Sequence, residues 1–370
     1  MAATLATLLS GCGLMDGSTT TTTTRSRAST DQADAVATPP GWAARRSAVV
    51  ARNLDVPWGL VFLPGGGILV GQRDRASILL LRPNGSRQVA RKLTNVAPNG
   101  DSGGEAGLLG LALSPRFTVN HWVYAYISSP HDNRVVKMRW THGRLGRQHR
   151  VFAGIPRSLH HNGGRIAFGP DGMLYVTTGD AEVSSRAQNR RALGGKILRM
   201  TPRGRPAPGN PFHRSVVYSI GHRNVEGLDW DSSGRLWATE FGDHAYDEIN
   251  LIRPGRNYGW PVVEGRSHRP RFTDPVVVWR TEEAGPSGIA IASVHGRTVA
   301  FVGAVTGQRL WRVVLHGTEA GKKTAVFVGT RGRIRTTAVA RGRLWITTSN
   351  TDGRATPRAG DDKLIRVRLR

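Results

Sequence analysis

His161 is the residue of this sequence best suited to acid–base chemistry. It lies in the segment HHNGGR (residues 160–165), directly before an apolar run with strand-like character. Histidine titrates near neutral pH, which is what a general base requires. One histidine among twelve is more often a surface or structural residue. The assignment of His161 as a base therefore depends on what the fold places beside it.

A second polar segment, GHRN at residues 221–224, precedes another apolar strand at the equivalent place of its repeat. Arg223 and Asn224 are its candidate binding residues. Because the two segments enter equivalent strands, we expect them to converge on one rim of the fold. The alternative for Arg223 and Asn224 is a turn with a solvated cation.

Asp247 and Glu248 form a pair of adjacent carboxylates after the loop FGDHAY (residues 241–246). Calcium prefers hard oxygen ligands, and backbone carbonyls of such a loop can complete its shell. Paired acids on a turn are usually solvated, but exposed acids are scarce in so basic a chain. The motif NYGWP (residues 257–261) adds a tight turn and a further carbonyl source. The segment is therefore a candidate calcium site.

Arg333 and Arg335, separated by one residue, lie at the start of the apolar segment that precedes the final one at residue 363. Alternate residues of a strand point to the same side. Two guanidinium groups on one side suit a polycarboxylate or a phosphate. The alternative is an arginine-rich surface, because the chain has 52 Lys+Arg against 26 Asp+Glu, a net charge of +26.

One sequence phrase recurs six times and positions these segments. It consists of a short apolar strand, a Gly-rich turn and a second strand, repeated roughly every 50–60 residues. This pattern predicts an all-β fold, a six-bladed β-propeller with four-stranded antiparallel blades, over residues 49–370. The equivalent position within the first strand of each phrase is occupied by Gly59, Gly110, Arg165, Gly227, Gly288 and Thr336. Candidates for outer strands begin at Ser77, Arg134, Lys196, Gln308 and Lys363.

The composition agrees with this architecture and excludes several classes of protein. The 46 glycines and 20 prolines suit a turn-rich β fold, and the single cysteine excludes a disulfide scaffold. No apolar run reaches the ~18 residues of a membrane-spanning helix. The cations are spread over all repeats without aromatic interleaving, so we expect no nucleic-acid binding. The charge suits an anionic cell surface or an anionic redox partner.

The N-terminal residues predict export. The stretch LLSGC (residues 8–12) resembles the lipobox of bacterial lipoproteins, in which the cysteine is lipidated; the alternative is a lone buried cysteine. We therefore treat residues 1–12 as a signal and lipobox segment. Residues 13–48, rich in Thr, Ser and Pro, predict a solvated tether. A lipid at Cys12 would be the sole membrane attachment of a cell-envelope or secreted protein.

Seven motifs together resemble the soluble quinoprotein glucose/sorbosone dehydrogenase family. The resemblance covers roughly residues 50–370, with every motif in family order: HNGGRIAFGPDGMLYVTTGD, GGKILRM, GNPF, GHRNVEGLDWD, DEINLI, NYGWP and GRIR. The resemblance implies a six-bladed propeller that holds pyrroloquinoline quinone (PQQ) and Ca²⁺ in the channel mouth. It implies oxidation of a sugar hydroxyl, typically of an aldose to its lactone, with electrons leaving to an external acceptor.

The resemblance also implies roles for individual residues. His161 matches the base that removes the hydroxyl proton while hydride passes to the quinone. Arg223 and Asn224 match cofactor contacts, and Arg333 and Arg335 match the pair that meets the cofactor carboxylates.

The resemblance further implies two calcium sites. Gly242 and Asp243 match the residues whose backbone carbonyls hold the cofactor calcium. Asp247, Glu248 and Tyr258 match a second, structural site.

The resemblance also implies one substrate-pocket residue, and this sequence differs from the family pattern at three places. Glu105 aligns with a polar residue that faces the substrate pocket. Asp243 stands where the best-known members have Pro, Thr336 stands where an acid is common, and residues 304–307 lack an expected Lys. These differences predict that binding of the quinone is weaker than in characterised members, or lost.

Two other classes of function remain open from the sequence. One is a catalytically silent propeller that acts as an extracytoplasmic binding lipoprotein. The other is a Ca²⁺-dependent lactonase-like hydrolase, which needs several carboxylates and asparagines on the axis. Arginine and histidine predominate in the predicted loops, which favours the dehydrogenase.

Overall fold

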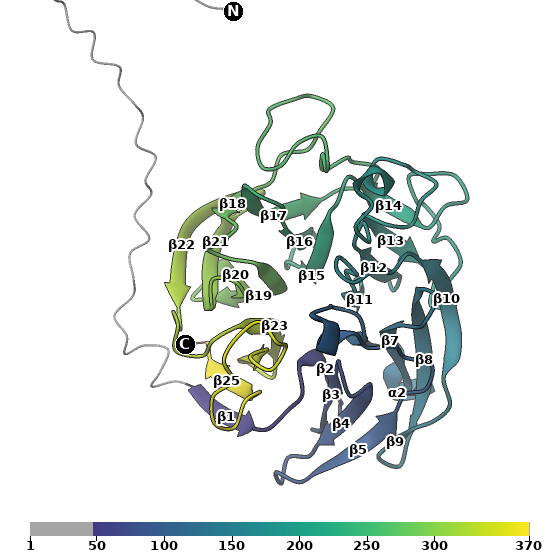
Figure 1. Ribbon diagram of the computed structural model, residues 1–370, viewed down its shortest axis with the longest axis vertical. Coiled ribbons are helices and arrows are strands. Elements are labelled where there is room, and N and C mark those ends of the chain that lie inside the picture. The colour runs from purple at the N-terminus through teal and green to yellow at the C-terminus, as the bar shows by residue number, and fades with distance from the viewer. Residues whose placement is uncertain (1–46, 370) are drawn as a thin grey trace, which may run out of the picture. The chain divides into compact units, whose positions relative to one another are not determined.

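The computed structural model describes residues 47–369, and these residues form a ring of small antiparallel sheets (Figure 1). Cys12 and nearly all of the expected tether lie outside the described residues. Within the described part of the chain, no helix is long and apolar enough to cross a membrane. The few helical segments are short: Gly100–Ser102, α2 (Phe117–Asn120) and Ser184–Ala187.

Blades 1 to 3 come from the first half of the chain. Blade 1 contains β2 (Pro57–Phe62), β3 (Ile68–Gln72), β4 (Ser77–Leu81) and β5 (Arg87–Lys92). Blade 2 contains β6 (Leu108–Leu113), β7 (Trp122–Ser128), β8 (Asn133–Thr141) and β10 (His149–Ile155), and the short β9 (Arg144–Leu145) also pairs with β8. Blade 3 contains β11 (Ile166–Phe168), β12 (Leu174–Thr178), β13 (Lys196–Met200) and β14 (Val217–Ile220).

Blades 4 to 6 complete the ring. Blade 4 contains β15 (Asn224–Trp230), β16 (Leu236–Phe241), β17 (Tyr246–Ile252) and β18 (Val277–Arg280). Blade 5 contains β19 (Pro286–Val294), β20 (Arg297–Ala304), β21 (Arg309–His316) and β22 (Glu319–Val326). Blade 6 contains β23 (Ile334–Ala340), β24 (Arg343–Thr348), β25 (Leu364–Arg368) and β1 (Ser47–Ala51).

The predicted all-β, six-bladed propeller with four-stranded antiparallel blades is confirmed. The two strands of each sequence phrase form the two inner strands of one blade. The strand candidates between phrases form third strands, such as β4 and β25. The ring closes in blade 6, where β1 pairs with β25 and Ser47 lies opposite Val367. This closure by the N-terminal strand was not expected from the sequence, because β1 is short and half-exposed.

The glycine of the repeated phrase marks the place where neighbouring blades touch. A Cβ on Gly110 would lie 2.4 Å from the backbone oxygen of Gly164, and one on Gly227 would lie 2.4 Å from that of Ser287. A Cβ on Gly288 would lie 2.6 Å from the backbone nitrogen of Thr337. Real Cβ contacts are not this short, so the inner strands can pack this closely because the side chain is missing.

The two phrases without this glycine supply side chains that fill the channel. The guanidinium carbon of Arg165, from blade 3, lies 4.0 Å from the centroid of the Trp58 ring in blade 1. Its Nε donates to the carbonyl of Glu226 in blade 4 (2.8 Å), and its Nη2 lies 3.3 Å from the hydroxyl of Thr336 in blade 6. The Thr336 hydroxyl donates to the Trp58 carbonyl at 2.6 Å. Arg165 thus links four blades across the axis.

Most predicted site segments lie at one end of the propeller, and the NYGWP segment (257–261) reaches them from the long loop between β17 and β18. They occupy loops that enter the innermost strands or connect second to third strands, as with residues 160–165, 221–224 and 242–245. In an antiparallel blade these loops share one end, which we call the upper face. The loops between first and second strands and between third and fourth strands form the lower face.

The close approach of the inner strands predicts a stability difference between two glycine substitutions. We expect Gly288→Ala to lower the free energy of unfolding by about 1–3 kcal/mol, because the new methyl group meets backbone of the next blade. Gly65→Ala is the matched control, because nothing lies within 4 Å of its Cβ. Urea unfolding of both variants measures the difference. An equal effect of both substitutions would contradict this account of blade packing.

Candidate active site

His161 and Asp180 form a hydrogen-bonded pair at the upper face of blade 3. The Nδ1 atom of His161 lies 2.8 Å from Oδ1 of Asp180, and the Asp180 side chain is 2% exposed. A carboxylate accepts, so Nδ1 carries the proton in this arrangement and Nε2 has its lone pair available. Among the described residues, Nε2 has no hydrogen-bond partner. The pair therefore presents a proton-accepting nitrogen in the geometry of a general base.

Asp180 is itself fixed by two further donors. Its Oδ2 accepts the indole N–H of Trp260 at 2.8 Å, and Oδ1 accepts the backbone N–H of Glu182 at 2.9 Å. Trp260 comes from the NYGWP loop of blade 4, so one carboxylate joins two blades. Sequence reasoning missed Asp180 and Trp260 as site residues. The signal for Asp180 was its place at the end of the VTTGD strand, in the loop that faces the histidine.

Two acidic residues hold the backbone around His161. Glu105 Oε2 accepts the His161 backbone N–H at 3.0 Å, and its other oxygen lies 3.4 Å from Arg354. Glu182 accepts the Ser158 hydroxyl and lies 2.9 Å from Nδ1 of His160. Burial alone would raise the pKa of Glu182, but the hydrogen bonds from Ser158 and His160 outweigh it and lower this pKa to about 2. The left-handed backbone of His161 (φ +53°) is thus held from both sides.

Lys196, in the GGKILRM motif, supports the loop that carries Asp180. Its side chain is buried, and its Nζ donates to the carbonyls of Arg186, Ala187 and Gly194 at 2.6–2.9 Å. These carbonyls belong to the loop between β12 and β13. Burial lowers the pKa of Lys196 to about 7. One side chain therefore gathers a loop that lacks regular secondary structure over most of its length.

The GHRN segment converges with the histidine segment, as its position in the repeat predicts. Asn224 Oδ1 accepts the backbone N–H of Gly163 at 2.9 Å, and the Arg223 carbonyl accepts the backbone N–H of Asp180 at 2.8 Å. The Arg223 guanidinium lies 5.5 Å from the Trp260 ring centroid, and its Nη2 donates to Asp243 at 2.7 Å. Its Nε is buried and has no partner among the described residues. The site therefore contains an unsatisfied donor that an anionic ligand would satisfy.

Arg333 and Arg335 lie on the same side of the sixth blade, and the protein supplies acids to both. Asp352 Oδ2 lies 3.0 Å from Arg333 and 3.1 Å from Arg335, and Glu226 Oε2 lies 2.8 Å from Arg335. Arg333 also donates to the Val305 carbonyl. Arg335 is 2% exposed and Arg333 is 7% exposed. Sequence reasoning missed Glu226 and Asp352, which lie far apart in the chain.

The charges of this cluster stabilise one another. Burial alone would raise the pKa of Asp352, but the two arginines outweigh it and lower this pKa. Burial lowers the pKa of Arg333, whereas Glu226 and Asp352 overcome the effect of burial on Arg335 and raise its pKa. The cluster therefore combines two arginines with two acidic residues, and the charge of Arg335 is balanced by Glu226 and Asp352.

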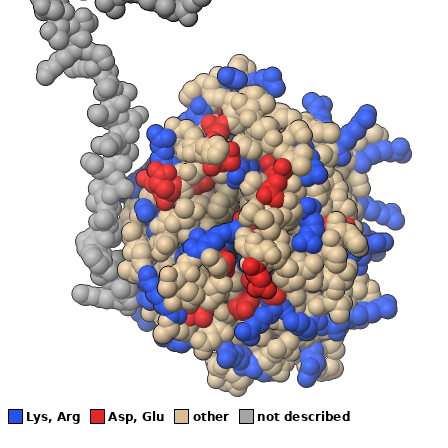
Figure 2. All heavy atoms as spheres, viewed as in Figure 1, with Lys and Arg blue, Asp and Glu red and all other residues tan. Residues whose placement is uncertain are grey.

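The loop expected to hold the cofactor calcium lies beside Arg223. The carboxylate of Glu264 caps this loop by accepting the backbone N–H groups of Asp243 (2.6 Å), Ala245 and Tyr246. Among the described residues, no hydrogen bond reaches the carbonyl oxygens of Gly242 or Asp243. Free carbonyls are ligands that calcium accepts. In the face seen in Figure 2, acidic residues lie around the centre of the ring, while Lys and Arg dominate its edge.

The expected second calcium site consists of side chains that hold the backbone. Asp247 accepts the backbone N–H groups of Gly242 (2.9 Å) and Gly285 (2.6 Å), and Glu248 accepts that of Gly265 (2.8 Å). The Tyr258 hydroxyl donates to the Leu251 carbonyl instead. Burial raises the pKa of Asp247 to about 7. Within the described part of the chain, no three His, Cys, Asp or Glu side chains are grouped as a metal site, so this second site remains a prediction.

Comparisons with known proteins agree with this fold and site. The model of the glucose/sorbosone dehydrogenase family matches residues 54–365. The PQQ-bound structure of an aldose sugar dehydrogenase from Streptomyces coelicolor superposes with a TM-score of 0.83 at 48% identity, covering 87% of this chain and 96% of that one. Quinoprotein glucose dehydrogenase B of Acinetobacter calcoaceticus is 31% identical over 59% of this chain, and the match spans 52% of the relative's length.

A further relative is the aldose sugar dehydrogenase YliI of Escherichia coli, which is 31% identical over 58% of this chain and 61% of its own length. The chain thus matches little more than half of each of these two curated relatives. The family model, in contrast, covers most of the propeller. The chain belongs to the glucose/sorbosone dehydrogenase family.

The buried acid between the two arginines predicts a stability effect. We expect Asp352→Asn to lower the free energy of unfolding by about 3 kcal/mol, because it leaves two buried arginines with less compensation. Chemical denaturation at pH 7 measures the loss. Asp101→Asn is the control, since Asp101 is exposed and has no ion pair among the described residues.

The lowered pKa of Asp352 also determines how the stability of the protein changes with pH. A carboxyl with a lowered pKa in the folded state stabilises the protein above its unfolded pKa and loses this effect as pH falls through the folded value. The wild type therefore loses the contribution of Asp352 below about pH 4, and the Asn variant lacks that part of the decline. Parallel acid-unfolding curves for the two proteins would contradict the role of the ion cluster.

Proposed function

We propose that this protein is a PQQ- and Ca²⁺-dependent oxidoreductase that oxidises a sugar hydroxyl, with His161 as the base. The observation that carries the proposal is the His161–Asp180 pair, which leaves Nε2 without a partner among the described residues, while Trp260 contacts both Asp180 and the Arg223 guanidinium. Family membership supports the same reaction, because the relatives described above are named as sugar dehydrogenases. An aldose hydroxyl oxidised to the lactone is the reaction type proposed.

The residues present fit an anionic quinone with a calcium ion. The buried Nε of Arg223 lacks an acceptor, and Arg333 is the less buried arginine of the neighbouring cluster. We assign these two guanidinium groups to the cofactor carboxylates, and the backbone carbonyls of Gly242 and Asp243 to the calcium ion. Asn224 contributes by holding Gly163, and Arg335 contributes by fixing Asp352. When bound, the quinone supplies a two-electron acceptor whose carbonyl calcium polarises.

The chain itself supplies the proton transfer and its geometry. Nε2 of His161 accepts the hydroxyl proton of the sugar. Asp180 keeps the imidazole in the tautomer that can accept, and its negative charge stabilises the imidazolium that forms. Trp260 and Glu105 limit movement of the carboxylate and of the His161 backbone. Glu105 also borders the substrate position in this proposal.

The residues that differ from the family pattern have structural partners in this chain. Asp243 pairs with Arg223, the carbonyl of Val305 accepts from Arg333, and Thr336 bonds to Trp58. We propose that these contacts replace the orienting function of the residues expected there. We further propose that electrons leave to an external acceptor and that the chain is exported and anchored through Cys12.

Titration of the full chain with PQQ and Ca²⁺, followed by an aldose panel with a dye acceptor, tests the function. We expect a saturable spectral change on quinone binding and dye reduction that needs quinone, calcium and sugar together. His161→Gln should lower kcat by about 10²–10⁴-fold, the usual contribution of a general base, while quinone still binds. Absence of quinone binding at tens of micromolar would overturn the proposal and favour a silent binding protein.

Asp180→Asn tests the positioning of the base. We expect a loss of kcat of at least about 10²-fold and a changed pH profile, because an amide does not favour the required tautomer of His161. Quinone affinity should stay within about threefold, since Asp180 is not assigned to the cofactor. Asp171→Asn is the control, because Asp171 pairs with Arg199 at the lower face. Full activity of the Asp180 variant with an unchanged pH profile would show that the pair does not orient the base.

A further inference from the structure

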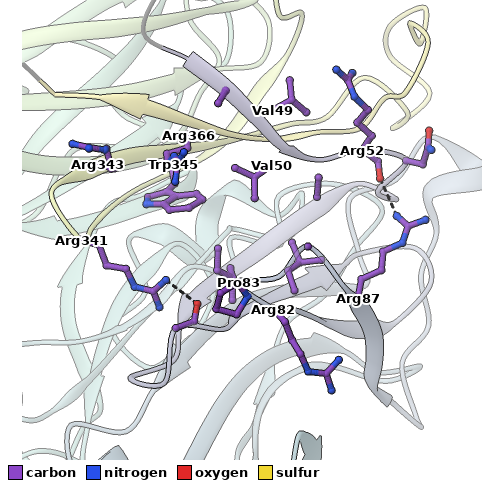
Figure 3. A pocket seen from close by; sticks show the side chains of 17 residues that line it. Val49, Val50, Arg52, Arg82, Pro83, Arg87, Arg341, Arg343, Trp345 and Arg366 are labelled. Atoms are coloured by element: carbon purple, nitrogen blue, oxygen red, sulfur yellow. Dashed lines mark hydrogen bonds between the residues drawn. The ribbon is translucent and has the colours of Figure 1, made fainter.

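An arginine-lined groove lies between blades 6 and 1, away from the candidate active site (Figure 3). Its volume is about 860 Å³. The walls come from β1, from β24 and β25, and from the turns after β2 and β4. Six arginines line it: Arg52, Arg82, Arg87, Arg341, Arg343 and Arg366.

The charge of this groove is not balanced by the protein. No Asp or Glu lines it, and among the described residues none of its six arginines has a carboxylate within 4.0 Å. This contrasts with Arg333 and Arg335, which lie within 4.0 Å of acidic side chains. An anion is therefore the ligand that the groove favours.

Arg87 and Arg341 shape the groove, Arg343 donates to the neighbouring Gly342 carbonyl, and Arg82 and Arg366 remain available. Arg87 donates to the carbonyl of Arg52 (3.0 Å), and Arg341 donates to the carbonyls of Gly66 (2.8 Å) and Leu63 (2.9 Å). These bonds join blade 1 to blade 6. Arg82 and Arg366 make no side-chain hydrogen bond within the described residues. Their guanidinium groups can each offer paired N–H donors to phosphate oxygens.

Most of the groove lies at the end of the propeller opposite the candidate active site, and Arg52 and Asn53 extend it along β1 toward the loop at Gly360. Arg341 and Arg343 lie at the β23–β24 turn, and Arg82 begins the β4–β5 turn; both turns belong to the lower face. In blade 6, Ala51 pairs with Leu364, close to the upper loop that holds Asp352, so Ser47 lies at the lower end. Ser47, the first described residue of β1, therefore lies at the end where most of this groove is found.

We propose that this groove binds the phosphate headgroups of an anionic lipid surface, a second membrane contact in addition to the lipid expected at Cys12. Clustered guanidinium groups match phosphate, and a half-open groove at the molecular edge can meet a surface that an enclosed pocket cannot. Val50, 41% exposed, and Pro83 supply apolar contact between the arginines. Docking in this way leaves the upper face free for substrate and electron acceptor. The proposal rests on the groove and not on the proposed dehydrogenase activity.

Vesicle co-sedimentation tests this proposal with the full chain carrying Cys12→Ser, which removes the candidate lipidation site. The probes are vesicles of phosphatidylglycerol mixed with phosphatidylcholine, and vesicles of phosphatidylcholine alone. The groove variant combines Arg82→Gln, Arg343→Gln and Arg366→Gln. The control variant combines Arg269→Gln, Arg271→Gln and Lys322→Gln, which remove the same charge from exposed positions in the β17–β18 loop and on β22.

We expect binding to the anionic vesicles and none to phosphatidylcholine alone. The groove variant should bind at least tenfold more weakly, since each basic residue near an anionic surface contributes to affinity, and the control should stay within threefold of wild type. Equal weakening of both variants would overturn the proposal in favour of a diffuse effect of net charge. Absence of vesicle binding, or groove-dependent binding of soluble polyphosphate alone, would overturn the assignment to a lipid surface. Thermal unfolding of the variants checks that they fold.

Discussion

The buried ion cluster of Glu226, Arg335, Asp352 and Arg333 is the constraint on which the upper face depends. Glu226 lies on the inner strand of blade 4, and the other three belong to blade 6. Charges buried this deeply are costly unless each finds a partner. The cluster therefore fixes blades 4 and 6 against each other across the channel. Arg165 and Thr336 extend the same links to blades 1 and 3.

The candidate active site uses the rigid frame that this cluster creates. Asp180, on blade 3, holds His161 directly and reaches blade 4 through Trp260. Arg223 lies between that pair and the acid-capped loop at Asp243. Asp180 and Trp260 join blades 3 and 4, and within the described part of this site the Nε of Arg223 is a buried donor without a partner. A site with its charges arranged in this way is prepared for an anion, with a proton acceptor beside it.

The sequence could predict the fold because the propeller repeats one local pattern. Gly110, Gly227 and Gly288 recur for a physical reason, the close contact between inner strands, and this made the repeat visible. His161 and Arg223 could be placed on one rim because equivalent loops of a propeller share one end. The pairing of Asp180 with His161, and of Glu226 and Asp352 with the two arginines of blade 6, could not be predicted, since these contacts join residues from different loops. The sequence also gave no sign that Asp247 and Glu248 accept backbone N–H groups.

The most direct test of this account is the crystal structure of the protein with PQQ and Ca²⁺ bound. The account predicts a cofactor carboxylate within about 3 Å of Arg223 Nε, with Arg335 still paired to Glu226 and Asp352. It also predicts the calcium ion at the carbonyls of Gly242 and Asp243. A quinone bound elsewhere, or one that leaves Arg223 Nε without a partner, would contradict the account.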